Sequence, residues 1–161
     1  MSVELPEAYI LSTQMNEILP GKIIRSSLLQ SYERLQKIGF INKDLEAFDN
    51  LIECKITSVT SRGMVIRIEL EKEMNLLLCP EYGGQIRYHE RQDTLPKKFH
   101  LKLDFTDDSL LTVRLTGMGL IFAACATCGP SRKPYNLSSY WLSSPIPIYL
   151  NHIQSSSCQS Y

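Results

Sequence analysis

The chain has 161 residues, enough to bury one sizeable core, and its 17 Lys and Arg balance 17 Asp and Glu. Because the net charge is zero, any nucleic-acid surface must come from local clustering of basic residues, and no apolar run approaches the roughly 20 residues that a membrane helix needs. The amino terminus carries acids where a secretion signal carries bases, and the 5 cysteines form an odd set typical of reduced thiols. We therefore expect a monomer in the cytoplasm with no membrane partner.

A helix is predicted close to the amino terminus. Pro6 suits its first turn, where the missing N–H is not needed, and Glu4 and Glu7 suit the positive end of the helix dipole. Pro20-Gly21 predicts the end of the helix. One apolar stripe is formed by Leu11, Met15, Ile18 and Leu19. We expect this stripe to pack on a core and to hold the start of the chain in place.

Beyond this helix the pattern is mainly that of short strands. Strands are expected at 22–29, 56–59, 65–70, 74–79, 85–89, 99–105, 110–115 and 118–124. Residues 31–43 are expected to form a polar connection, and a second helix is expected from 42 or 43 to 52. The predicted fold is mostly β with two helices: an antiparallel β-sandwich flanked by helices.

Composition changes near residue 123. Residues 123–161 contain no Asp or Glu, are rich in Ser and Pro, and keep no hydrophobic period. We therefore expect a β-sandwich domain over 1–122 and an irregular tail over 123–161.

Six short motifs follow one another in the predicted domain. They are Glu4-Leu5-Pro6-Glu7, Gly21-Lys22-Ile23-Ile24, Ile56-Thr57-Ser58-Val59-Thr60-Ser61-Arg62-Gly63, Gly84-Gln85-Ile86-Arg87-Tyr88-His89, Leu95-Pro96-Lys97-Lys98 and Leu103-Asp104-Phe105-Thr106-Asp107-Asp108. In this order they resemble the N-terminal domain of the formamidopyrimidine-DNA glycosylase / endonuclease VIII family, over about residues 1–122. That domain is a β-sandwich flanked by helices. The resemblance does not extend into 123–161, where the family continues into a helix–two-turn–helix segment, and we interpret this tail as a replacement by truncation or a change of reading frame.

The resemblance implies a catalytic site at the amino terminus. In the family, a proline exposed by removal of Met attacks the sugar of a damaged nucleotide, and the next Glu handles protons. Glu4 and Glu7 match the family's two glutamates, but Val3 occupies the position of the nucleophile. Removal of Met1 would leave Ser2 to supply the amine, one residue earlier. Such a shift moves the nitrogen by about 3.5 Å, and errors of about 1 Å can cost a hundredfold in rate.

The resemblance also implies contacts with damaged double-stranded DNA. Lys97 and Lys98 align with a Lys-His run of the family, and His100 aligns with its second histidine, which suggests phosphate contacts. Tyr82 lies where the family inserts a side chain into the gap left by an everted nucleotide. The alternatives are a solvated charged loop and a tyrosine in a tight turn.

Two arginines complete the expected DNA surface. Arg62 and Arg87 should lie on one face with the lysines, beside the amino terminus. Met64 stands where the family has a phosphate-binding lysine, so one cation of that surface is lost, and we expect Met64 to pack. His89, next to this group, is expected to be a surface histidine.

No cofactor is expected unless the tail binds zinc. Cys125 and Cys128 have the spacing of half a zinc ribbon, and His152 with Cys158 would complete a three-cysteine, one-histidine site. The alternative is free thiols in the tail.

Three functions remain open at this point. The first is a DNA glycosylase with lyase activity, acting on oxidised bases in base excision repair. The second is an inactive or truncated remnant that keeps at most DNA binding. The third is a β-sandwich interaction domain unrelated to DNA, which the zero net charge favours.

Overall fold

The computed structural model describes residues 5–81, 83–91, 95–117 and 119–126, and every structural statement below concerns these ranges. The chain divides into two units, Met1–Cys125 and Ala126–Tyr161, and the described elements all belong to the first.

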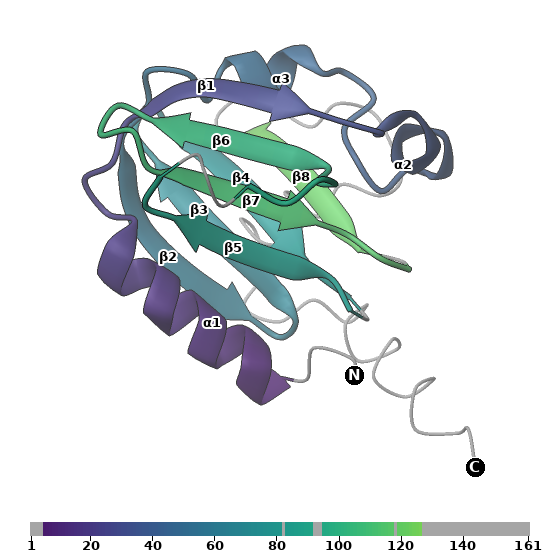
Figure 1. Cartoon of the computed structure of the whole chain (residues 1–161), viewed down its shortest axis with the longest axis horizontal. Coiled ribbons are helices and arrows are strands. Elements are labelled where there is room, and N and C mark those ends of the chain that lie inside the picture. The colour runs from purple at the N-terminus through teal and green to yellow at the C-terminus, as the bar shows by residue number, and fades with distance from the viewer. Residues whose placement is uncertain (1–4, 82, 92–94, 118, 127–161) are drawn as a thin grey trace. The chain divides into compact units, whose positions relative to one another are not determined.

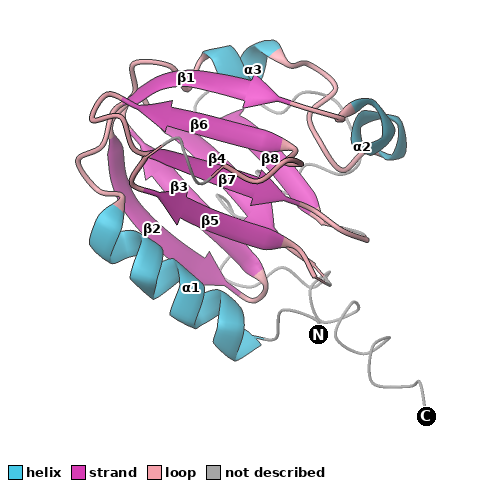
Figure 2. Ribbon diagram, in the orientation of Figure 1, coloured by secondary structure: helices cyan, strands magenta, loops and turns pink. Residues whose placement is uncertain are grey.

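Two four-stranded antiparallel sheets form the first unit (Figures 1 and 2). One sheet has the order β1-β6-β7-β5, with β1 at Ile24–Leu29, β6 at Leu101–Phe105, β7 at Leu110–Arg114 and β5 at Gln85–His89. The other has the order β2-β3-β4-β8, with β2 at Ile56–Arg62, β3 at Val65–Leu70, β4 at Met74–Cys79 and β8 at Leu120–Cys125. The predicted antiparallel sandwich is confirmed.

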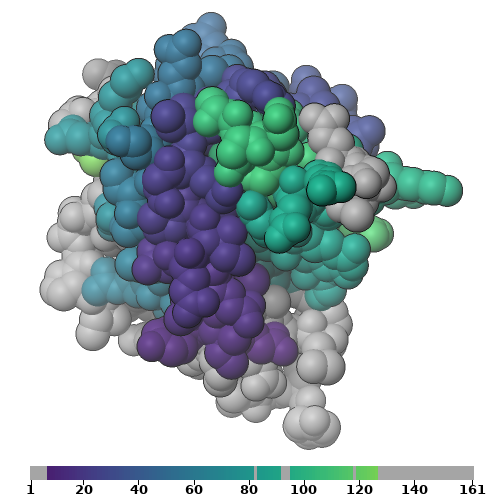
Figure 3. All heavy atoms as spheres, turned by 60° about the vertical axis from the view of Figure 1, so that its left-hand side comes forward, coloured from purple at the N-terminus to yellow at the C-terminus, as the bar shows by residue number. Residues whose placement is uncertain are grey.

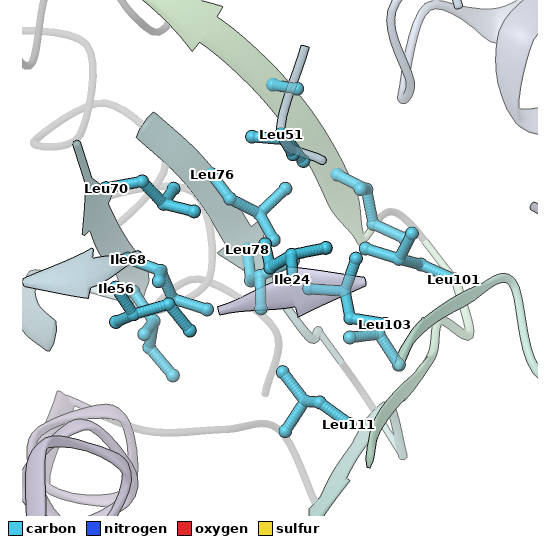
Figure 4. Packing of buried hydrophobic residues seen from close by; sticks show 14 of the residues in the cluster. Ile24, Leu51, Ile56, Ile68, Leu70, Leu76, Leu78, Leu101, Leu103 and Leu111 are labelled. Carbon is cyan, nitrogen blue, oxygen red and sulfur yellow. The ribbon is translucent and has the colours of Figure 1, made fainter. Parts of the chain in front are cut away.

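Side chains from both sheets fill the space between them (Figure 4). In β6, Leu101, Leu103 and Phe105 are fully buried, as their alternation predicts. Every residue of β4 is buried, as its apolar run predicts, and Met74, Leu76 and Leu78 belong to the core between the sheets. Full burial of one such side chain stabilises the fold by about 1.5–3 kcal/mol, so this shared core fixes the positions of all the strand ends.

Helix α1, Leu5–Ile18, packs along β2 at one open side of the sandwich (Figure 3). Ala8, Met15 and Leu19 are buried, but Ile18 is 44% exposed, so the predicted stripe is wrong at that position. Ser12 is buried in its place, and its hydroxyl bonds to the Tyr9 carbonyl at 2.9 Å. This local bond satisfies the hydroxyl, so a serine can replace an apolar residue on the packed face.

Two short helices follow β1 at the other side. Helix α2, Glu33–Ile38, was not predicted, because six residues are too few to show a helical period. It ends at Gly39, whose left-handed backbone forms a C-cap. Helix α3 covers only Glu46–Asp49, shorter than the helix predicted from 42 or 43 to 52. The described residues therefore contain three helices where the sequence predicted two.

The segment around α3 also closes an edge of the second sheet. Phe48 and Leu51 reach the core, each at most 1% exposed. The Asn42 side chain donates to the Ala123 carbonyl at 2.7 Å and accepts from the Ala123 amide at 2.9 Å. Since Ala123 lies in edge strand β8, this pair of bonds substitutes for a neighbouring strand.

The strands lie where they were expected: β3, β4 and β5 have the predicted bounds, and the ends of the others differ by at most three residues. Within the described ranges, no helix has both the length and the apolar character needed to cross a membrane.

Candidate nucleic-acid interface

Three chain reversals meet at one end of the sandwich, which we call the turn end: β2 joins β3, β4 joins β5, and β7 joins β8. The pairing register aligns Cys79 with Leu120 and Gln85 with Arg114, so these strand ends lie at the same level. The Thr116 hydroxyl donates to the Glu81 carbonyl at 3.3 Å, which ties two of the reversals together.

Helix α1 starts at this end. Its Asn16 side chain accepts a hydrogen bond from the Val59 amide at 2.7 Å, and the Gly21 amide donates to the Ile56 carbonyl at 2.8 Å. The helix therefore runs antiparallel to β2, and its first turn lies toward the end of that strand (Figure 1). Glu7 lies in that first turn and is half-buried.

Close backbone packing shapes the reversals. A Cβ atom on Gly119 would lie 2.8 Å from the Cys79 carbonyl oxygen and 2.9 Å from a methyl of Leu115. Gly83 has a φ of +74°, which side chains rarely adopt. Glycine is therefore required where the β7–β8 reversal crosses the end of β4.

Exposed cations surround the turn end. Lys97 and Lys98 precede β6, Arg114 ends β7, and Arg87 lies on the edge strand β5. All four are exposed, and none forms an ion pair with another residue in the described part of the chain. Unpaired cations are available to bind phosphate, so the surface is suited to an anionic polymer.

The expected cations do not lie on one flat face. Arg62, half-buried at the end of β2, belongs to one sheet, whereas Arg87 belongs to the other. Strand β6, which follows Lys97 and Lys98, is in the same sheet as Arg87. Arg62, Lys97 and Lys98 lie at the turn end, and Arg87 lies two residues further along β5, so a ligand that contacts all four must cross both sheets.

His100 is fixed as a neutral hydrogen-bond donor. Its Nδ1 accepts the Leu115 amide at 2.9 Å, so its proton is on Nε2. Burial and the nearby charge of Arg114 lower the pKa of His100 below its ordinary value. The predicted contact between His100 and phosphate must therefore be a neutral N–H bond near pH 7.

The prediction that His89 is a surface histidine was wrong. His89 is 7% exposed, and its Nε2 lies 2.9 Å from the Thr112 hydroxyl. Burial and the charge of Arg87 lower the pKa of His89. The pair lies on the outer face of its sheet, since Leu111 and Val113, the residues on either side of Thr112, point into the core.

The other polar groups of the turn end are weak acids. Burial raises the pKa of the Glu81 carboxyl above its ordinary value. Burial, with the charge of Glu81, raises the pKa of the Cys79 thiol to about 12, so this thiol stays protonated at neutral pH and is not a nucleophile.

Several predicted site residues lie outside the described residues. These are Ser2, Glu4, Tyr82, Cys128, His152 and Cys158. Cys125 is half-buried at the end of β8, and within the ranges given above no three His, Cys, Asp or Glu side chains gather as metal ligands. Met64 is half-buried after the end of β2.

Arg114 and Arg34 were missed from the sequence. Arg114 is paired with Gln85, so pairing the predicted strands in register would have placed it beside the other cations. Arg34 lies on α2, whose position depends on the fold of the 31–43 connection.

A family model places this domain among known proteins. Residues 3–117 match the model "Formamidopyrimidine-DNA glycosylase N-terminal domain". The chain belongs to this family. The match ends near the β7–β8 reversal, and the resemblance seen in the ordered motifs is confirmed.

Solved structures share the fold of this glycosylase domain. Formamidopyrimidine-DNA glycosylase of Lactococcus lactis, in a complex with DNA containing an abasic site, matches with a TM-score of 0.64 and 21% identity. MutM in complex with DNA containing carbocyclic 8-oxo-G matches with a TM-score of 0.62 and 22% identity. The first match covers 75% of this chain and 43% of the solved one, and the second covers 74% and 44%. The chain therefore spans less than half the length of these structures. Comparison with curated proteins gave no match.

Proposed function

We propose that this glycosylase-family domain binds damaged double-stranded DNA across its turn end and that the chain acts as a DNA glycosylase with lyase activity on oxidised bases. The observation that carries the proposal is the position of the first turn of α1, which lies at the same end as the exposed cations. A nucleophile at the amino terminus and a phosphate-binding surface would then meet the same stretch of duplex.

The DNA contact rests on charge. Lys97, Lys98, Arg87 and Arg114 are exposed and would each replace a counterion at a phosphate. Binding should therefore weaken steeply as salt rises. The solved structures are complexes with DNA containing an abasic site or carbocyclic 8-oxo-G, which supports the same class of ligand here.

The chemistry rests on the residues that directly precede α1. After removal of Met1, the lone pair of the Ser2 amine attacks the sugar C1′, and the bond from C1′ to the base breaks. The base leaves with the bonding electrons and is protonated, and the nitrogen loses a proton. The sugar ring then opens: the bond from C1′ to O4′ breaks, O4′ takes a proton, and the nitrogen lone pair forms the imine with C1′. Glu4 is the residue we propose for proton transfer at the sugar, and Glu7 would assist from the first turn of α1.

Borohydride trapping tests this function. Reduction of the imine should join the chain covalently to DNA that contains an abasic or 8-oxoguanine site. Acetylation of the Ser2 amine should abolish the adduct, and Glu4→Gln should slow its formation by about 10²–10⁴-fold. Salt-dependent DNA binding without any adduct would reject catalysis. Absence of binding at low salt would reject DNA as the ligand and favour the interaction-domain alternative.

A non-catalytic DNA-binding domain is the second candidate, favoured by Val3 at the position of the family nucleophile. Deletion of Ser2 combined with Val3→Pro restores the Met-Pro-Glu order of the family. If only the nucleophile is lacking, this variant should form the adduct when the natural chain does not. Failure of both to react would locate the defect elsewhere in the chain.

We also propose a zinc site formed by Cys125, Cys128, His152 and Cys158, on their spacing alone. Metal analysis of the purified chain should give one zinc per molecule. Cys128→Ser should remove it. A chain purified without zinc that also fails to bind added zinc would exclude this site.

A further inference from the structure

A pocket of about 310 Å³ lies between α2 and the β7–β8 reversal. Its size is at the lower limit of ordinary small-ligand sites. Leu35 and Leu115, both buried, and Ile38, 50% exposed, provide apolar walls. Arg34 and His100 provide polar groups.

The polar groups of the pocket are mainly neutral. His100 uses Nδ1 to accept the Leu115 amide, so the remaining ring nitrogen, Nε2, is a donor. In the described part of the chain, this Nε2 has no hydrogen-bond partner. Ser31 is a further polar residue of the lining. Apolar walls with a few neutral donors and acceptors suit a planar heterocycle better than a bare anion.

The pocket is continuous with the turn end. Thr116, one of its lining residues, donates to the Glu81 carbonyl of the β4–β5 reversal. His100 follows Lys97 and Lys98 by two or three residues. A nucleic-acid strand bound by those lysines would therefore pass the mouth of the pocket, where the exposed Arg34 can contact a phosphate.

We propose that this pocket binds an unstacked nucleobase, with Leu35, Ile38 and Leu115 against its faces, His100 Nε2 on its edge and Arg34 at the phosphate of the same nucleotide. Proteins that take a base out of the stack hold it in this way, by apolar contacts on its faces and hydrogen bonds to its edge. The inference rests on the proposed function only for the source of the base, which would be the bound DNA.

Titration with small ligands tests the pocket independently of DNA repair. In methyl-resolved NMR spectra of the full chain, thymidine should shift the Ile38 and Leu115 methyl signals, with a Kd on the order of 1 mM. Thymidine 5′-monophosphate should bind several-fold more tightly, because its phosphate reaches Arg34. Deoxyribose 5-phosphate, which lacks the base, should leave the methyl signals in place.

Three variants on α2 sharpen the test. Ile38→Ser changes a half-exposed position that the fold tolerates, and it should weaken thymidine binding about fivefold. Arg34→Gln should weaken binding of the monophosphate to the affinity of thymidine and leave the affinity for thymidine unchanged. Lys37→Gln is the matched control, because Lys37 is exposed on the same helix but does not line this pocket.

Two results would overturn the inference. One is an equal shift by deoxyribose 5-phosphate or inorganic phosphate, which would make the pocket an anion site. The other is no shift by thymidine well above 1 mM. Neither result depends on imine trapping, so failure of the pocket and failure of the proposed catalysis can be told apart.

Discussion

The two ends of the sandwich use charge in opposite ways. At the end opposite the turn end, where β3 joins β4 and β6 joins β7, basic and acidic side chains pair with one another. Lys22 pairs with Asp107, Arg25 pairs with Asp108 at 2.8 Å, and Lys55 pairs with Glu71 at 3.3 Å. We call this the ion-pair end. At the turn end, Arg87, Lys97, Lys98 and Arg114 are exposed and have no such partner in the described ranges.

This difference explains how a chain of zero net charge can carry a surface for an anionic ligand. At the ion-pair end, three acids, Glu71, Asp107 and Asp108, each neutralise a local base. Net charge is a sum over the molecule, whereas ligand binding responds to the potential at one place. The predictions that follow test this separation of the two ends.

The largest effect is expected at the core, which the two ends share. Phe48 is 1% exposed and reaches the core from α3. Phe48→Ala should lower the free energy of unfolding by about 3–5 kcal/mol, because a cavity replaces the ring. Urea denaturation measures this. Leu28→Ala, at a residue that is 49% exposed, is the control and should cost much less. A similar loss in both variants would contradict the position of α3 in the core.

A second variant acts on the turn end alone. Gly119→Ala places a methyl 2.8 Å from the Cys79 carbonyl oxygen, so backbone must move. We expect a loss of about 1–3 kcal/mol in unfolding free energy. Gly39→Ala is the control for the steric contact. Its Cβ would meet nothing within 4 Å, so any loss of unfolding free energy in that variant comes from the positive φ alone. DNA binding should fall in the Gly119 variant and stay unchanged in the Gly39 variant.

Removing two positive charges from one end or from the other compares the two ends directly. Lys97→Gln combined with Lys98→Gln should weaken DNA about ten- to thirtyfold near 0.15 M salt and reduce the slope of log K against log salt by about 2, if each lysine binds one phosphate. Fluorescence anisotropy over a range of salt measures both. Lys72 is exposed in the turn between β3 and β4, at the ion-pair end. Lys55→Gln combined with Lys72→Gln therefore removes the same charge from that end and should leave the slope unchanged. Equal effects would show that binding follows net charge and not the turn end.

The smallest effect is expected on the pH dependence of stability, through Asp107 at the ion-pair end. Hydrogen bonds from Lys22 and then Ser109 lower the pKa of Asp107 to about 2. A carboxyl whose folded pKa lies below its unfolded value stabilises the fold above the unfolded pKa, near 4, and loses that contribution as pH falls toward 2. Because Asp107 is 48% exposed, we expect less than about 1 kcal/mol. Asp107→Asn should lose less stability between pH 4 and pH 2 than the natural chain, measured by urea denaturation. An identical pH dependence in both proteins would contradict the pairing.

Much of the fold could be predicted because short-range patterns encode it. The alternation of Leu101, Leu103 and Phe105 predicted β6, and the apolar run of β4 predicted a buried strand. Helix α2 escaped prediction because a six-residue helix has too few apolar positions to reveal its period. Ile18 was misplaced because the predicted stripe followed helical spacing, whereas the packing of α1 against β2 decides which face is buried.

The sequence by itself determined the family, the strands and the basic and acidic side chains, because these depend on residue order and local periodicity. Only the tertiary structure decided which charges pair and which stay exposed, since Lys22 and Asp107 are far apart in sequence and meet through the register of β1 with β6. It also brought Arg34 on α2 to the same pocket as His100 beside β6. Long-range strand pairing controls both outcomes, and no local pattern records it.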